Sequence, residues 1–211
     1  MANWNYRDVY LKYDMTGVIN IGTGTVQVHD IFNPLPEFMK EADCIFIDPP
    51  CSRANLSAFY TKADMQNEKE YVEFKNRLWE CLDEIKPKIL FLELFKSNQK
   101  DFIAEAQKRY KYVDVYNSTY YHRASSKCVI VHCHNDETAP LPIEGMDEED
   151  VIKWIAHNID YKCIGDLCMG RGLVGYFSNE AGKKFVGTEL NKKRLAILLD
   201  MINNGTMKGY H

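Results

Sequence analysis

Residues Cys163 to Gly175 read CIGDLCMGRGLVG, an apolar run of strand length that leads into glycines at positions 170, 172 and 175. Glycine has no Cβ atom, so the backbone can turn sharply there and approach a ligand closely. The next apolar run begins at Phe185 and ends at Glu189, whose carboxylate can accept hydrogen bonds from ribose hydroxyl groups. A strand, a glycine-rich turn, a helix and a second strand that ends in an acid are typical of a nucleotide-binding Rossmann-like unit.

Before this unit, short apolar and β-branched runs alternate with segments that have the apolar spacing of helices. The alternation predicts an α/β fold with a mostly parallel sheet. Val113–Tyr116 and Cys128–His132 are too close in sequence for a crossover helix, so we expect them to form an antiparallel hairpin. The expected strands are Val26–His29, Cys44–Ile47, Ile89–Glu93, Val113–Tyr116, Cys128–His132, Cys163–Leu167 and Phe185–Glu189. The expected helices are Tyr71–Ile85, Gln99–Tyr110, Glu148–Ile159 and Lys192–Ile202.

The composition is that of a globular protein. With 211 residues, 45% of them hydrophobic, the chain can bury a full core without disulfides, so we expect a single domain over residues 1–211. The seven cysteines are odd in number and scattered through apolar segments, which favours reduced thiols and a cytoplasmic location. No segment predicts a membrane span or a secretion signal. The net charge of -4 means that local basic clusters must supply any contact with nucleic acid.

A second loop carries groups suited to catalysis. The predicted strand Cys44–Ile47 runs directly into DPPC, residues 48–51, and ligands in open α/β sheets bind just beyond such strand ends. Pro49 and Pro50 fix the backbone and bring no N–H donor, so Asp48 and the Pro49 carbonyl form a fixed pair of acceptors. This pair suits the exocyclic amino group of a base, a poor nucleophile that reacts when its hydrogens are held and a methyl donor lies beside it.

The spacing of the glycine turn does not by itself separate a dinucleotide from S-adenosylmethionine. Asp166 lies four residues before the first glycine of the motif, where its carboxylate can bind the ammonium group of a methionine. The motif also comes late in the sequence, whereas a dinucleotide fold begins with it. Both observations favour S-adenosylmethionine, and a nicotinamide-dependent oxidoreductase is the weaker hypothesis.

These motifs resemble those of the DNA amino-methyltransferases. Residues 48–50 look like the catalytic Asp-Pro-Pro-aromatic motif of that family, residues 166–172 look like its Asp-Pro-Phe-x-Gly-x-Gly cofactor motif, and Phe185–Asn191 looks like the stretch that follows. The catalytic motif (48–51) precedes the cofactor motif (166–175), which is the circularly permuted order of the β class. The resemblance covers Val26 to Ile202. It implies a Rossmann-like methyltransferase fold with a seven-stranded, mostly parallel sheet and an antiparallel edge hairpin.

The same resemblance implies the site and its ligands. The cofactor would be S-adenosyl-L-methionine, and the partner would be DNA in preference to RNA. The residues with a catalytic role would be Asp48, Pro49, Pro50 and Cys51. The residues that bind the cofactor would be Asp30, Asp48, Asp166, Cys168, Gly170, Gly172, Glu189 and Asn191.

Two departures from the family's pattern affect the substrate. Cys51 stands where the family has an aromatic residue that stacks on the flipped base, and a thiol offers no π face, so we expect Phe59, Tyr60 or Tyr121 to supply the stack. DNA members also insert a recognition region, for which only residues 52–70 and 117–126 are available here. We therefore expect modest selectivity for DNA sequence, unless a second copy of the chain or a recognition partner supplies the selectivity. The compact chain favours an enzyme of a restriction-modification system.

Cys51 supports a rival mechanism, because the cytosine carbon-5 methyltransferases place a nucleophilic cysteine at the same strand end. Leu78–Lys96 also resembles the helix and strand that carry the Glu-Asn-Val motif of that family, with Glu93 as the glutamate, but Leu94 replaces the asparagine and no Gln-x-Arg motif follows. Asp48 favours amino transfer, because the carbon-5 enzymes usually have glycine or serine there. We therefore expect adenine N6 methylation. Cytosine carbon-5 methylation and an inactive binding module on the same scaffold are the alternatives.

Four residues near the predicted hairpin, Cys128, His132, Cys133 and His134, are of metal-binding types. Their spacing fits no usual zinc pattern, and neighbouring strand residues point to opposite faces of a sheet. We therefore expect buried strand residues here and no metal site.

Overall fold

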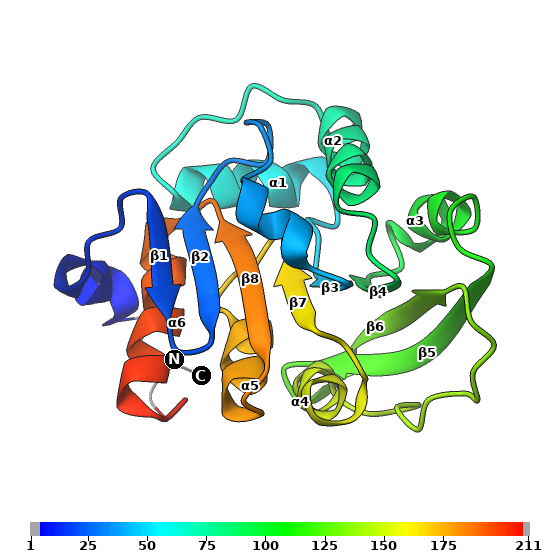
Figure 1. Cartoon of the computed structure of the whole chain (residues 1–211). Helices are drawn as coiled ribbons and strands as arrows, with labels where there is room; N and C mark the ends of the chain where they lie inside the picture. Colours follow the sequence, from blue (N-terminus) through cyan, green and yellow to red (C-terminus); the bar gives the residue numbers. More distant parts are fainter. Residues whose placement is uncertain (1–4, 209–211) are drawn as a thin grey trace.

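The computed structural model describes residues 5–208. The expectation of no secretion signal falls in part on the first four residues, which lie outside the described part. The strands are β1 (Val18–Ile21), β2 (Gly24–Val28), β3 (Cys44–Ile47), β4 (Ile89–Leu94), β5 (Tyr112–Tyr120), β6 (Arg123–His134), β7 (Cys163–Asp166) and β8 (Lys184–Glu189). They form one sheet in the order β1-β2-β8-β7-β3-β4-β6-β5 (Figure 1). The strands from β2 to β4 in this order are parallel. In contrast, β1 is antiparallel to β2, and β6 is antiparallel to β4 and β5.

Helices cover both faces of this sheet (Figure 1). One face packs against α1 (Arg53–Lys62), α2 (Tyr71–Ile85), α3 (Gln99–Ala106) and the 3-10 helix η2 (Glu37–Glu41). The other packs against α4 (Glu148–Asn158), α5 (Leu173–Glu180) and α6 (Lys192–Asn204), and the 3-10 helix η1 (Asn5–Lys12) contacts α6. Every residue of β3 and β7 is buried, which explains why these strands read as continuous apolar runs. None of the described helices is both long and apolar enough to cross a bilayer.

Local sequence explains the bounds of α2. The helix begins after Glu70, whose side chain accepts the N–H of Glu73 while the Glu73 carboxylate accepts the N–H of Glu70 at 2.7 Å. It ends at Lys86, which has a left-handed φ of 56° and precedes Pro87. Between these ends, apolar side chains recur every three or four residues and face the core. They are Phe74, Leu78, Leu82 and Ile85.

All seven predicted strands and the edge hairpin are present, but the expected total of seven strands is wrong. The eighth strand is β1, which pairs with β2 from Val18 opposite Gln27 to Ile21 opposite Gly24. Only four residues long, β1 lies at the sheet edge and alternates between exposed and half-buried positions. A run so short and so little buried does not stand out from a loop in the sequence.

The two segments considered for DNA recognition are mostly regular structure. Residues 52–70 contain α1, and residues 117–126 lie in β5 and β6 apart from a turn at Tyr121 and His122. The hairpin is therefore longer and its turn tighter than expected. Little unstructured chain is left in these two segments to read a DNA sequence.

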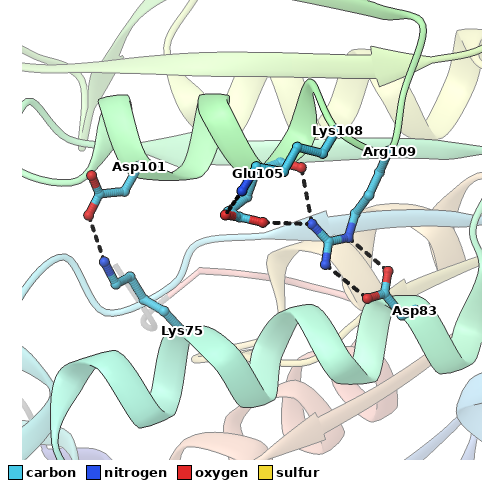
Figure 2. A network of polar contacts seen from close by, with 6 residues as sticks. All are labelled: Lys75, Asp83, Asp101, Glu105, Lys108 and Arg109. Atoms are coloured by element: carbon cyan, nitrogen blue, oxygen red, sulfur yellow. Dashed lines mark hydrogen bonds and ion pairs between the residues drawn. The ribbon is translucent and has the colours of Figure 1, made fainter.

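Polar contacts join α3 to α2 on one face of the sheet (Figure 2). The Arg109 guanidinium donates two hydrogen bonds to Asp83 on α2, at 2.8 and 2.9 Å, and one of 2.8 Å to Glu105 on α3. Lys75 on α2 pairs with Asp101 on α3 at 2.6 Å. The planar guanidinium makes a two-pronged contact that an ammonium cannot make.

Replacing Arg109 should therefore destabilise the fold. Arg109→Ala removes the ion pair with Asp83 and the cation–π contact with Trp79, whose ring centroid lies 4.7 Å from the guanidinium carbon. We expect a loss of about 1 kcal/mol in the free energy of unfolding, measured by urea denaturation, because solvent weakens the ion pairs. Lys108→Ala is the control, since Lys108 also pairs with Glu105 but is 66% exposed. Equal losses in the two variants would contradict this account.

Candidate active site

A cavity of about 400 Å³ lies at the carboxyl ends of β3 and β7. These two strands are neighbours in the middle of the sheet (Figure 1). After β7 the chain continues to β8 on one side, and after β3 it continues to β4 on the other. Ligands of open α/β sheets bind at such a point because the two loops diverge there. The predicted site residues on the cavity wall are Asp30, Asp48, Pro49, Pro50, Cys51, Phe59, Tyr60, Tyr121, Asp166, Cys168, Gly170 and Glu189.

Two carboxylates hold the glycine-rich turn. Asp166 accepts a hydrogen bond of 2.8 Å from the backbone N–H of Cys168. Glu189 accepts one of 2.6 Å from the N–H of Gly170 through one oxygen and one of 2.9 Å from the N–H of Asn191 through the other. Gly170 has a φ of 55°, in the left-handed region that favours glycine. Carboxylate oxygens have a second lone pair each, so both acids can also accept a hydrogen bond from a ligand.

The structure places two predicted cofactor residues, Gly172 and Asn191, off the cavity wall. Gly172 precedes α5 with a φ of 83°, and a Cβ atom there would lie 2.6 Å from the Cβ of Leu198 on α6. Asn191 precedes α6, accepts a hydrogen bond from the N–H of Lys193 and donates one to the Lys62 carbonyl, both of 2.9 Å. Both residues therefore fix the helices that frame the cavity.

Asp30 and Tyr60 form one end of the cavity. The Tyr60 hydroxyl donates a hydrogen bond of 2.9 Å to Asp30, whose same oxygen also accepts the N–H of Phe32 at 3.1 Å. Tyr60 is buried, and burial raises the pKa of its hydroxyl. Tyr60 is one of the three residues predicted to stack on the base, and its hydroxyl is held at the Asp30 end of the cavity.

The loop after β3 is held from three sides. The Tyr71 hydroxyl donates a hydrogen bond of 2.7 Å to the Pro50 carbonyl. The Cys51 N–H donates to the Asn55 side chain at 3.1 Å, and the Ser97 hydroxyl donates to the Cys51 carbonyl at 3.3 Å. Among the described residues, no hydrogen bond reaches the Pro49 carbonyl. The loop is thus rigid and keeps that carbonyl available.

Tyr120, which sequence reasoning missed, contacts Asp48. Its hydroxyl donates a hydrogen bond of 3.3 Å to the Asp48 carboxylate. Tyr120 ends β5 beside Tyr121 and His122, which have φ values of 57° and 51° and form a two-residue hairpin turn of the type usually made by asparagine and glycine. The backbone N–H of His122 donates to Asp147 at 2.7 Å and holds this turn. Because the turn lacks Asn and Gly, no signal in the sequence marked it.

Glu93 and Glu148 form a carboxyl pair on the cavity wall near Asp48. Both are almost fully buried, and each has one buried oxygen with no hydrogen-bond partner among the described residues. Because burial raises the pKa of both groups, each keeps a proton near neutral pH and can donate a hydrogen bond as well as accept one. Burial is the main cause of the raised pKa values of Asp48, about 7, and Glu148, about 8. Burial also raises the pKa of Glu93, and the charges of Asp48 and Glu148 raise it further.

The cavity is acidic. Burial raises the pKa of Asp166, and the nearby carboxylates of Glu189 and Asp48 raise it further. Such a site favours a ligand with positive charge and disfavours the pyrophosphate of a dinucleotide. The acids on the wall are Asp30, Asp48, Glu93, Glu148, Asp166 and Glu189, and the cationic side chains are Lys62, Arg171 and Arg194.

Solved structures share this α/β fold. M1.HpyAVI superposes with a TM-score of 0.55 at 14% identity, over 84% of this chain and 98% of that chain. TTHA0409 of Thermus thermophilus, named as a candidate DNA modification methylase, has a TM-score of 0.57 at 9% identity, over 85% of this chain and 94% of that chain. The PvuII DNA methyltransferase, named as cytosine-N4-specific, has a TM-score of 0.54 at 9% identity, over 90% and 94%. M1.HpyAVI has also been solved with S-adenosylmethionine, as has TTHA0409.

No protein-family model matches the chain, and no curated protein matches it. At this low identity, the likeness to solved structures establishes the fold alone. The chain thus has the α/β fold of DNA methyltransferases. The residues on the cavity wall are the evidence for its chemistry.

The buried Asp48 should make stability depend on pH. Its pKa is about 7 in the folded chain and 3.8 when exposed, so its contribution to stability is fully present below pH 3.8 and is lost as the pH rises to about 7. Asp48→Asn cannot ionise, so we expect its Tm to exceed that of the wild type by roughly 5 °C at pH 8 and by less at pH 5. Calorimetry measures both values. The exposed Asp160→Asn serves as a control, and an equal gain for Asp48→Asn at both pH values would refute the assignment.

Proposed function

We propose that this chain is a single-domain, circularly permuted methyltransferase that uses S-adenosylmethionine to methylate the exocyclic amine of a base in DNA, at adenine N6. The observation that carries the proposal is one acid-rich cavity lined both by the Asp48–Pro49 acceptor pair and by the turn that Asp166 and Glu189 hold. The fold shared with DNA methyltransferases supports it.

The cavity wall suits the charge of the cofactor. S-adenosylmethionine carries an ammonium group and a sulfonium group and has no phosphate. Asp166 would accept the ammonium, Glu189 the ribose hydroxyls, and Asp30 would lie at the adenine end, with the backbone of Gly170 in close contact. Burial and the neighbouring carboxylates penalise the ionised form of Asp166, and a bound cation would offset that penalty. When bound, the cofactor supplies an electrophilic methyl group.

Asp48 and the Pro49 carbonyl would hold the hydrogens of the target amine. The hydroxyl of Tyr120 fixes one carboxylate oxygen of Asp48. The amine nitrogen gains the methyl group and gives up one proton, for which Asp48 is the nearest acceptor in this arrangement. A pKa of about 7 suits a group that must take a proton near neutral pH.

The rest of the cavity would hold the flipped base. Phe59, Phe95 and Tyr121 offer aromatic faces on its wall, so the missing aromatic at Cys51 has replacements. Glu93 and Glu148, which burial keeps protonated near neutral pH, can donate a hydrogen bond to the ring nitrogen next to the amine. Adenine N1 and cytosine N3 both present such an acceptor.

Activity should depend on Asp48 and on pH. We expect Asp48→Asn to lower kcat by roughly 10² to 10⁴-fold while S-adenosylmethionine still binds, because the variant keeps the shape and cannot take the proton. In the wild type, kcat/KM should rise with pH through about 7 as Asp48 ionises. Mass spectrometry of nucleosides from DNA and RNA incubated with the protein identifies the product. No methylated base in either would sink the proposal.

A second candidate function is cytosine carbon-5 methylation. The observation in its favour is that Cys51 and Glu93 line the same cavity, as a nucleophile and an acid for one base would. Cys51 is also partly exposed, so a base could reach its thiol.

Cys51→Ser distinguishes the two reactions. Under the amine proposal, we expect this variant to keep at least about half of the wild-type rate, because serine matches the size of cysteine and no covalent step is needed. Under the carbon-5 reaction, the variant would be inactive while Asp48→Ala would retain activity. The nucleoside product, an N-methyl or a 5-methyl base, checks the assignment independently.

A further inference from the structure

The β5–β6 hairpin carries a second cluster of polar side chains. Asp114, His132 and His134 each offer one oxygen or nitrogen atom, and these three atoms lie within 4.8 Å of one another. This is the one such group of His, Cys, Asp or Glu side chains found among residues 5–208. None of the three lines the candidate active site.

Strand register brings the three residues together. Asp114 lies directly opposite His132 in the antiparallel pair, so their side chains are on the same face. His134 is two residues further along β6 and therefore on that face too, whereas Cys133 packs into the core on the other side. Adjacent strand residues point to opposite faces, but His132 and His134 are alternate residues of β6 and share one face.

The hydrogen bonds of His134 require a proton or a metal ion between its ring and Asp114. Nδ1 lies 2.6 Å from the Asp136 carbonyl, which can only accept, so Nδ1 carries a hydrogen. In a neutral ring, Nε2 then has a lone pair, and it lies 3.0 Å from a carboxylate oxygen of Asp114. Two lone pairs face each other there. Either a second proton on the ring or a metal ion must separate them.

His132 supplies an independent second observation. It is 3% exposed, and its Nδ1 is buried with no hydrogen-bond partner among the described residues. Its ring is stacked between those of Phe91 and His134, with centroids 4.7 and 4.2 Å away. Because a zinc ion lies in the plane of the imidazole that binds it, the two histidines share one ion when the His132 ring turns out of this stack. A buried imidazole nitrogen without a partner costs free energy, and coordination of Nδ1 to a metal ion would remove that cost.

We propose that Asp114, His132 and His134 bind a divalent transition-metal ion, with Zn²⁺ as the best match. Two imidazoles and one carboxylate are a common zinc ligand set, completed by water. The Asp136 carbonyl orients His134 through its other ring nitrogen, as partners of zinc-bound histidines do. Asp114 is 48% exposed at its side chain, which gives the ion a path from solvent. The ion ties β5 to β6 and has a structural role.

Zinc binding to the full-length protein tests this proposal. The protein is reduced with a phosphine, stripped with a chelator and titrated with Zn²⁺, and metal content and Tm are measured. We expect one zinc ion per chain and a Tm that rises with zinc. Asp114→Asn and His132→Phe should each weaken binding at least about tenfold and remove the rise in Tm. His157→Phe, at an exposed histidine on α4, should behave like the wild type.

The design separates the alternatives. His132→Phe keeps a ring between Phe91 and His134, and Asp114→Asn changes a half-exposed residue, so one of the two variants is expected to fold. No zinc uptake by the wild type would mean that a proton bridges Asp114 and His134, and the proposal fails. Zinc binding that persists in both variants also overturns it. A thiolate-to-cobalt charge-transfer band with Co²⁺ would place the metal on cysteines instead, and the proposal would fail in that case too.

Discussion

The parallel pairing of β3 with β7 is the contact on which the site depends. Cys44 lies opposite Ile164 and Ile45 opposite Gly165, so the loops that follow these strands leave the sheet side by side. Gly165 is needed for this packing, because a Cβ atom there would lie 2.5 Å from the Cδ1 of Ile45 and 2.8 Å from the Cβ of Ala42. Two segments more than a hundred residues apart thereby form one cavity.

That pairing also concentrates acids where the sheet excludes water. Asp166 ends β7, Asp48 directly follows the neighbouring strand β3, and Glu93 is the second-last residue of β4, the next strand along. Each has a raised pKa for the same leading cause, burial, so ionisation of these acids destabilises the fold as the pH rises. A bound cation would offset the cost of ionising these acids. Ionisation of Asp48, which the proposed reaction needs, therefore opposes the stability of the fold.

Sequence reasoning reached what short-range patterns specify. The apolar runs located seven strands, the residues after β3 and β7 located both loops, and twelve of the predicted site residues line the cavity. The sequence carried no signal for contacts between residues that are far apart in the chain. Tyr60 bonds to Asp30, which is thirty residues away, and Gly172 is required by Leu198 on another helix. His132 and His134 form a cluster with Asp114 because β5 places Asp114 opposite His132. The spacing of residues within β6 does not show this pairing.

The tip of the β5–β6 hairpin shows how such contacts set the geometry of the cavity. Tyr121 and His122 both adopt positive φ without being glycine, which costs free energy at each residue. Asp147 compensates by accepting hydrogen bonds from the His122 backbone at 2.7 Å and the Thr119 hydroxyl at 2.9 Å. A relaxed, longer loop would remove the strain, but it would also release Tyr120 from Asp48. The two-residue turn fixes the direction in which the end of β5 leaves the sheet. That direction brings the Tyr120 hydroxyl to 3.3 Å from the carboxylate of Asp48, the residue after β3.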